Sequence, residues 1–108
     1  MNETDRTQML DVATLAPVGY AGRPDAVRER LEGRTLIVSD PSDICWLTGF
    51  GGSLGWVVLT PERLALVTDG RYGERAAADV AAGGIDGDVV VGTTRQQVRD
   101  RLVAAARA

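Results

Sequence analysis

The chain has 108 residues, 44% of them hydrophobic and 25% charged, which is ordinary for a single globular domain. Its net charge of −3 provides no basic patch for nucleic acid, and no apolar run approaches the ~20 residues that span a membrane. Because the first residues are acidic and polar, unlike the basic start of a secretory signal, we expect a cytoplasmic protein without nucleic-acid or membrane partners.

The N-terminal part of the chain divides into a tail and a first helix. Residues 1–22 lack sustained periodicity and are interpreted as a tail or a docking arm. Pro24 suits the first turn of a helix, where its missing N–H costs nothing, and Val27 and Leu31 share a face four residues apart. Gly33 is expected to end this helix.

A strand, a short helix and a hairpin are expected next. The β-branched run 35–38 predicts a buried strand. Asp40 is expected to cap, and Pro41 to open, a helix that Gly49 ends. The apolar runs 56–59 and 64–67, joined by a proline-containing turn, predict an antiparallel hairpin.

The rest of the chain alternates helix and strand. Asp69 is predicted to cap a helix over 71–82, and 88–91 reads as a further strand. Thr94 and Gln97 have the spacing of a capping box, which opens a last helix. These elements predict an α/β fold with a mixed sheet and flanking helices. Because a further strand is expected after the last helix, the sheet is predicted to be incomplete at its C-terminal side.

The glycine-rich stretch 49–55 could be a serine nucleophile elbow or a phosphate cradle, and both interpretations fail on context. Gly51, Ser53 and Gly55 match the G-x-S-x-G string of a hydrolase, but that motif needs a strand before the serine and a helix after it. The chain has no histidine as a base, and all twelve basic residues are arginine, so no phosphate-loop lysine exists. We expect a tight connection into a strand, without catalytic residues.

Several polar residues have a structural and a functional interpretation. Asp40, Asp43 and Asp69 could form a carboxylate metal site, but helix capping and the helix dipole explain them better, so no metal ligand is assigned. Arg71 could bind an anion, although pairing with a nearby acid is the favoured use.

The single cysteine and the aromatic residues near the loop also have two interpretations. Cys45 is expected to be a small apolar packing residue. Trp46, Phe50 and Trp56 are candidates for the core, and exposure of one of them at an interface is the alternative.

Two segments together resemble a known protein module. Trp-Leu-Thr-Gly-Phe-Gly-Gly-Ser at 46–53 and Thr-Asp-Gly-Arg-Tyr at 68–72 flank the hairpin, after a Leu-Ile-Val strand and Asp-Pro-Ser-Asp-Ile. This order resembles the N-terminal domain of the creatinase, prolidase and Xaa-Pro aminopeptidase family. The resemblance implies a creatinase N-terminal-domain-like (ribonuclease H-like) fold over residues 23–108.

The resemblance also implies a function. In that family, a separate C-terminal catalytic domain holds two divalent metal ions (manganese or cobalt) that hydrolyse the bond before proline, and the N-terminal domain supports homodimerisation and closes the substrate pocket. We expect no cofactor in this chain, with its own catalytic domain and a second copy as partners. The alternatives are a stand-alone interaction or regulatory module and a small-ligand-binding protein that uses loop 49–55.

The resemblance assigns two sets of residues. The expected pocket wall, which would act on the neighbouring subunit, comprises Cys45, Trp46 and Phe50. The expected structural signature comprises Gly49, Gly51, Gly55, Asp69, Gly70, Arg71 and Tyr72.

Overall fold

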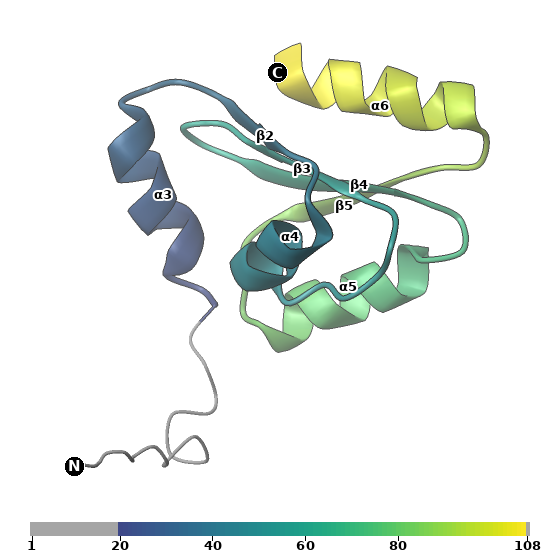
Figure 1. Ribbon diagram of the computed structural model, residues 1–108, viewed down its shortest axis with the longest axis horizontal. Helices are drawn as coiled ribbons and strands as arrows, with labels where there is room; N and C mark the ends of the chain where they lie inside the picture. Colours follow the sequence, from purple (N-terminus) through teal and green to yellow (C-terminus); the bar gives the residue numbers. More distant parts are fainter. Residues whose placement is uncertain (1–19, 108) are drawn as a thin grey trace.

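The computed structural model describes residues 20–107, so nearly all of the expected tail at 1–22 lies outside the described residues. Helices interleave with strands and one β-hairpin along this part of the chain, around one sheet (Figure 1). The elements are α3 (Arg23–Leu31), β2 (Leu36–Val38), α4 (Pro41–Thr48), β3 (Trp56–Leu59), β4 (Leu64–Asp69), α5 (Gly73–Ala82), β5 (Asp88–Gly92) and α6 (Arg95–Arg107).

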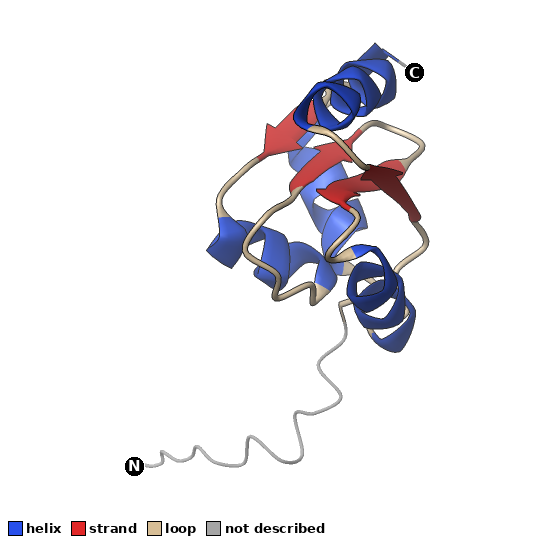
Figure 2. Cartoon of the chain, turned by 90° about the vertical axis from the view of Figure 1, so that its right-hand side faces the viewer, coloured by secondary structure: helices blue, strands red, loops and turns tan. Residues whose placement is uncertain are grey.

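The sheet has four strands in the order β2-β3-β4-β5. β2, β3 and β4 form an antiparallel meander, whereas β5 runs parallel to β4 after the crossover through α5. Helices α4 and α5 lie against one face of the sheet and α6 against the other (Figures 1 and 2). The sequence-based prediction of a mixed sheet with flanking helices is therefore confirmed.

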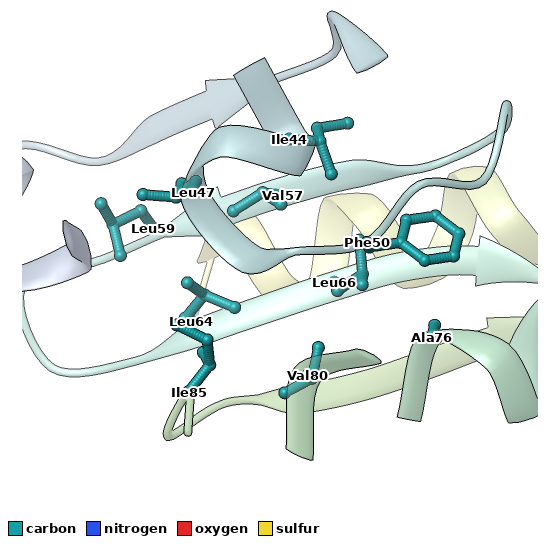
Figure 3. Packing of buried hydrophobic residues seen from close by; sticks show 10 residues of the cluster. All are labelled: Ile44, Leu47, Phe50, Val57, Leu59, Leu64, Leu66, Ala76, Val80 and Ile85. Atoms are coloured by element: carbon teal, nitrogen blue, oxygen red, sulfur yellow. The ribbon is translucent and has the colours of Figure 1, made fainter. Parts of the chain in front are cut away.

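The main core lies between the sheet and the face that carries α4 and α5. Strand residues alternate between the two faces, so Val57 and Leu66 point into this core and are fully buried. Figure 3 shows them meeting Leu47 of α4 and Val80 of α5. The complete buried cluster is Ile44, Leu47, Phe50, Val57, Leu59, Leu64, Leu66, Ala76, Val80 and Ile85.

The opposite face of the sheet is covered by α6. Val58 and Val67, which alternate with the core residues of β3 and β4, are buried on this side. Val98 is the buried residue of α6, and Leu102 one turn later is half-buried, as the helical spacing predicts. A single amphipathic helix thus provides the second layer.

Helix α4 begins and ends at the residues that the sequence predicts. Asp40 Oδ1 accepts a hydrogen bond of 2.8 Å from the backbone N–H of Ser42, which caps α4. At the other end, Gly49 has φ of 84°, and its N–H donates to the Cys45 carbonyl at 2.7 Å. This left-handed residue turns the chain out of the helix at no steric cost.

Three local predictions are wrong in detail. The run 35–38 is not a buried strand, because β2 lies at the edge of the sheet and Ile37 is 50% exposed. Asp69 does not cap α5, which begins at Gly73 without a side-chain cap. It is instead the last residue of β4, and its carboxylate accepts a hydrogen bond from the backbone N–H of Arg71 in the turn that follows. Gln97 reaches the N–H of Thr93 rather than that of Thr94, so only half of the capping box forms.

Candidate functional site

The two signature segments, far apart in sequence, lie side by side. Loop 49–55 joins α4 to β3, and the turn 69–72 joins β4 to α5. The hydroxyl groups of Ser53 and Tyr72 are hydrogen-bonded at 2.7 Å, and the rings of Phe50 and Tyr72 meet edge-on with centroids 5.9 Å apart. Thr68 Oγ1, which is buried, donates to the Leu54 carbonyl at 2.6 Å. These contacts hold the two segments as one unit.

Loop 49–55 folds tightly over the Phe50 ring. A Cβ atom at Gly52 would lie 2.2 Å from Cζ of Phe50, which no real contact allows. Phe50 is only 1% exposed and belongs to the core, as Figure 3 shows. Position 52 therefore requires glycine because the backbone passes directly over a buried ring.

Gly70, in contrast, does not need to be glycine for space or backbone geometry. A Cβ atom there would meet nothing within 4 Å, and its φ is not positive. Gly70 belongs to the expected structural signature, but neither the space around it nor its backbone conformation requires glycine.

Asp69 and Arg71 form an ion pair within the turn. Asp69 accepts hydrogen bonds of 3.0 Å from both the backbone N–H and the Nε of Arg71. The bond from the Arg71 side chain lowers the pKa of the Asp69 carboxyl, and the carboxylate in turn raises the pKa of the guanidinium. The favoured interpretation of Arg71 as the partner of a nearby acid is thus confirmed.

Among residues 20–107, the Ser53 hydroxyl is hydrogen-bonded to the Tyr72 hydroxyl and to no carboxylate. The hydrogen bond from Ser53 lowers the pKa of the Tyr72 phenol, with a smaller effect from the nearby Arg71 charge. A serine nucleophile needs a group that takes its proton. The hydroxyl of Tyr72 does not supply one, so the geometry is that of a structural cross-link.

The three expected pocket-wall residues occupy different environments. Phe50 is in the core, Cys45 is half-buried, and Trp46 is 51% exposed on α4. The guanidinium of Arg23 lies 4.7 Å from the Trp46 ring centroid and 4.6 Å from that of Tyr20. This stacking fixes an exposed indole in place. Of the three, only Trp46 presents a large aromatic surface.

Two cavities lie near the signature segments and Trp46. One of about 640 Å³ lies between the signature segments and the start of α6, and three arginines, Arg71, Arg95 and Arg99, are part of its lining together with Leu54 and Trp56. A second, of about 420 Å³, lies between α3, β2 and α4 and includes Ile37 and Trp46. Both are open clefts at the surface.

No group of three or more histidine, cysteine or acidic side chains with the geometry of a metal site occurs within residues 20–107. In the same part of the chain, no helix has the length and apolar character needed to cross a bilayer.

Comparison with known proteins identifies the domain. Residues 23–107 match the family described as the creatinase/prolidase N-terminal domain. The chain belongs to this family. The match covers both signature segments and every helix and strand of the described structure.

Solved structures of this creatinase/prolidase type share the fold. An N-terminal domain of the cytoplasmic peptidase PepQ from Mycobacterium tuberculosis H37Rv is 28% identical, with a TM-score of 0.59 over 67% of this chain and 56% of that one. An Xaa-Pro aminopeptidase from Streptococcus pyogenes is 27% identical, with a TM-score of 0.60 over 82% of this chain and 65% of that one. No curated protein matches the chain.

The domain is a part of some relatives rather than the whole. An Xaa-Pro dipeptidase from Bacillus anthracis has the same fold at 16% identity, with a TM-score of 0.64, and the match covers 82% of this chain but 23% of that enzyme. The match thus covers between 23% and 65% of the chains of these three structures. Related creatinase/prolidase domains are therefore found within larger peptidases.

Sequence reasoning missed the contacts that define the site in this domain. The Arg23 stack joins residues of two helices that only the tertiary fold brings together. The Thr68–Leu54 bond likewise crosses between loop 49–55 and β4. One signal was present for the pair Ser53–Tyr72, since both residues belong to the segments that carried the resemblance.

Proposed function

We propose that this chain is the non-catalytic N-terminal domain of a metal-dependent Xaa-Pro peptidase, in which it supports dimerisation and closes the substrate pocket. One observation carries the proposal: residues 23–107 match the creatinase/prolidase N-terminal domain. The relative described as an Xaa-Pro aminopeptidase supports the substrate class, and the relative described as a cytoplasmic peptidase supports the location.

The metal belongs to another domain in this proposal. Two divalent ions, manganese or cobalt, would be held by the catalytic domain and would activate water for attack on the bond before proline. The side chains of residues 20–107 do not fit such a site, because the sequence has no histidine and the acids of this part of the chain form no group that could hold a metal ion. No step of the hydrolysis is assigned to residues of this chain.

Trp46 is the residue proposed to contact substrate. Its ring is 51% exposed and is braced by Arg23, so it can present a fixed apolar wall to a proline ring. Phe50 contributes indirectly, because its buried ring holds the loop that follows α4. Cys45, on the same helix, remains a neighbour of this wall.

Two measurements test the proposal. The coding sequence downstream of Ala108 should encode a histidine-containing catalytic domain; a stop codon would favour the stand-alone interaction or regulatory module. The purified 108-residue chain should not hydrolyse an Xaa-Pro dipeptide with Mn²⁺ or Co²⁺, and turnover abolished by EDTA would overturn the assignment.

The role of Trp46 has its own test in a peptidase that contains this domain. Trp46→Ala should raise KM for an Xaa-Pro substrate while kcat changes little, because the wall binds substrate without touching the reacting atoms. Val103→Ala, at an exposed position of α6, is the matched control. Equal effects of the two substitutions would refute the pocket-wall role.

Small-ligand binding beside loop 49–55 is a second candidate, favoured by the cleft of about 640 Å³. Arg95 and Arg99 in its lining suit an anion. Titration with inorganic phosphate, followed by NMR, should then shift the amide signals of Leu54 and Arg71 in a saturable way. No saturable shift is expected if the chain acts only as a peptidase domain.

A further inference from the structure

The cleft of about 640 Å³ lies where two neighbouring parallel strands end. β4 and β5 run parallel, and their last residues, Asp69 and Gly92, are partners in the sheet. The chain continues from β4 into α5 on one face of the sheet and from β5 into α6 on the other (Figures 1 and 2). In α/β proteins, such diverging connections leave a crevice at the carboxyl ends of the strands, where small ligands bind. The lining fits this place, because it includes Arg71, shortly after β4, and residues 93–95, directly after β5.

Three arginines give this cleft a positive wall. Arg95 and Arg99 lie one turn apart on the same side of α6, and both are exposed. Neither is paired with an acid within residues 20–107. Arg71 is paired with Asp69, which also belongs to the lining, so three arginines and one aspartate leave a net charge of +2. A phosphate monoester, with a charge of about −1.5 to −2 at neutral pH, matches this charge better than a single carboxylate does.

Positive charge is concentrated on α6. The helix carries four arginines and one acid, whereas the whole chain has a net charge of −3. That acid, Asp100, accepts a hydrogen bond of 2.9 Å from Gln96 and is paired with no arginine within the described residues. Arg95 is the first residue of α6, where the helix dipole disfavours a cation. An anion held between Arg95 and Arg99 would offset both the dipole and the repulsion of the two like charges.

Apolar side chains also line the cleft. Val98 is buried there, and three more residues are half-buried and so keep exposed surface: Leu54, Trp56 and Leu102. Trp56 lies on the same face of the sheet as Val58, two residues later in β3, and α6 covers this face. Pockets of roughly 300–1,000 Å³ suit small organic ligands, and inorganic phosphate alone would leave most of the apolar wall without contact. The lining therefore favours a ligand that joins a phosphate to a flat apolar ring.

We infer that this cleft binds a phosphate monoester with a flat ring, of which a nucleoside monophosphate is the common example. Arg95 and Arg99 bind the phosphate, since guanidinium groups form paired hydrogen bonds with phosphate oxygens. The ring lies against the half-buried indole of Trp56. This role rests on the small-ligand binding proposed above as a second candidate function, and it names the ligand class.

Titration of the 108-residue chain with adenosine monophosphate, adenosine and inorganic phosphate tests the inference. Trp46→Phe leaves Trp56 as the only tryptophan, so quenching of its fluorescence reports contact with the ring. The nucleotide should quench this signal in a saturable way and bind at least about tenfold more tightly than adenosine. Phosphate, which does not quench, should displace the nucleotide at higher concentration. Adenosine binding as tight as that of the nucleotide would refute the role of the arginines.

Arginine substitutions test the place of the phosphate. Arg99→Ala should weaken binding of adenosine monophosphate at least about tenfold, because it removes one of the two guanidinium partners. Arg107→Ala removes the same charge outside the cleft lining, about 12 Å farther along α6, and should change the affinity less than about twofold. Both positions are exposed, and circular dichroism should confirm that both variants are folded. Equal weakening by the two substitutions would refute the site, because it would show only a general attraction to a positive helix.

The outcomes separate this ligand class from the functions proposed above. Saturable binding of phosphate, with the nucleotide no tighter, would refute the ligand class but keep the anion site. No saturable binding of any probe up to about 10 mM would refute the site and, with it, the ligand-binding candidate. Neither result would change the peptidase assignment, which is tested by the coding sequence downstream of Ala108.

Discussion

Replacing Gly52 with alanine tests the close packing of the signature loop. The added Cβ would lie 2.2 Å from Cζ of Phe50 and within 2.9 Å of both Cε atoms. Ordinary carbon contacts lie at about 3.5 Å or more, so the ring or the loop must move by more than 1 Å. The ring cannot swing into solvent without leaving the core, because Phe50 is 1% exposed and its edge meets Tyr72.

The expected cost of Gly52→Ala is about 3 kcal/mol, at the upper end of the usual cost of overpacking. The 88 described residues predict a total stability of about 4–13 kcal/mol, so this is a large part of it. The melting temperature should fall by roughly 12–24 °C for a domain of this size. Urea unfolding followed by tryptophan fluorescence gives the free energy directly.

A matched control and a mutant cycle isolate the contact. Gly70→Ala adds the same methyl group where nothing lies within 4 Å, so its effect should be below about 0.5 kcal/mol. Phe50→Leu removes the ring, and Gly52→Ala should then cost at least about 1 kcal/mol less than in the wild type. Additive effects, or similar costs at positions 52 and 70, would refute the argument.

Substitutions at three further positions test individual interactions. Arg71→Leu should return the pKa of Asp69 toward its ordinary value of 3.8, as measured by NMR titration. Because the pKa of Asp69 is lowered in the folded protein, the stabilisation by this pair is present above pH 3.8 and is lost as the pH falls through the folded pKa. The variant should lack this loss of stability at low pH. Thr68→Val should cost about 1–2 kcal/mol in urea unfolding, since it leaves the Leu54 carbonyl without its donor; a neutral effect would mean that water replaces the hydroxyl. Asp40→Ala should cost about 1 kcal/mol by the same assay and Asp40→Asn less, and equal costs would argue against capping.

Local patterns predicted the elements of this fold well. Pro41 after an aspartate and Gly49 after an apolar run marked both ends of α4, because capping and left-handed backbone depend on residues next to the helix. The hairpin of β3 and β4 followed from two apolar runs around a proline turn. Signals of this kind need no knowledge of the tertiary structure.

The position of a strand within the sheet was not predictable in the same way. A β-branched run such as 35–38 fits a central strand and an edge strand equally, and only the order of strands decides which it is. The prediction for Asp69 was wrong for a related reason. An aspartate before a helix suits both a helix cap and a turn, and here Asp69 bonds within a turn that precedes the start of α5 at Gly73.

The sequence also could not predict which of Trp46 and Phe50 is buried. Both are aromatic, they lie four residues apart, and each suits the core equally well. Trp46 lies on α4 with half of its surface exposed, whereas Phe50 follows the left-handed turn at Gly49 and is buried in the core. That division decides what each can do. The Phe50 ring is enclosed by Gly52, Tyr72 and the core, so its role is to stabilise the fold of the loop. The Trp46 ring keeps half of its surface free and is braced by Arg23. If α4 and the loop after it face substrate in a whole peptidase, Trp46 rather than Phe50 is the aromatic side chain with free surface for the contact.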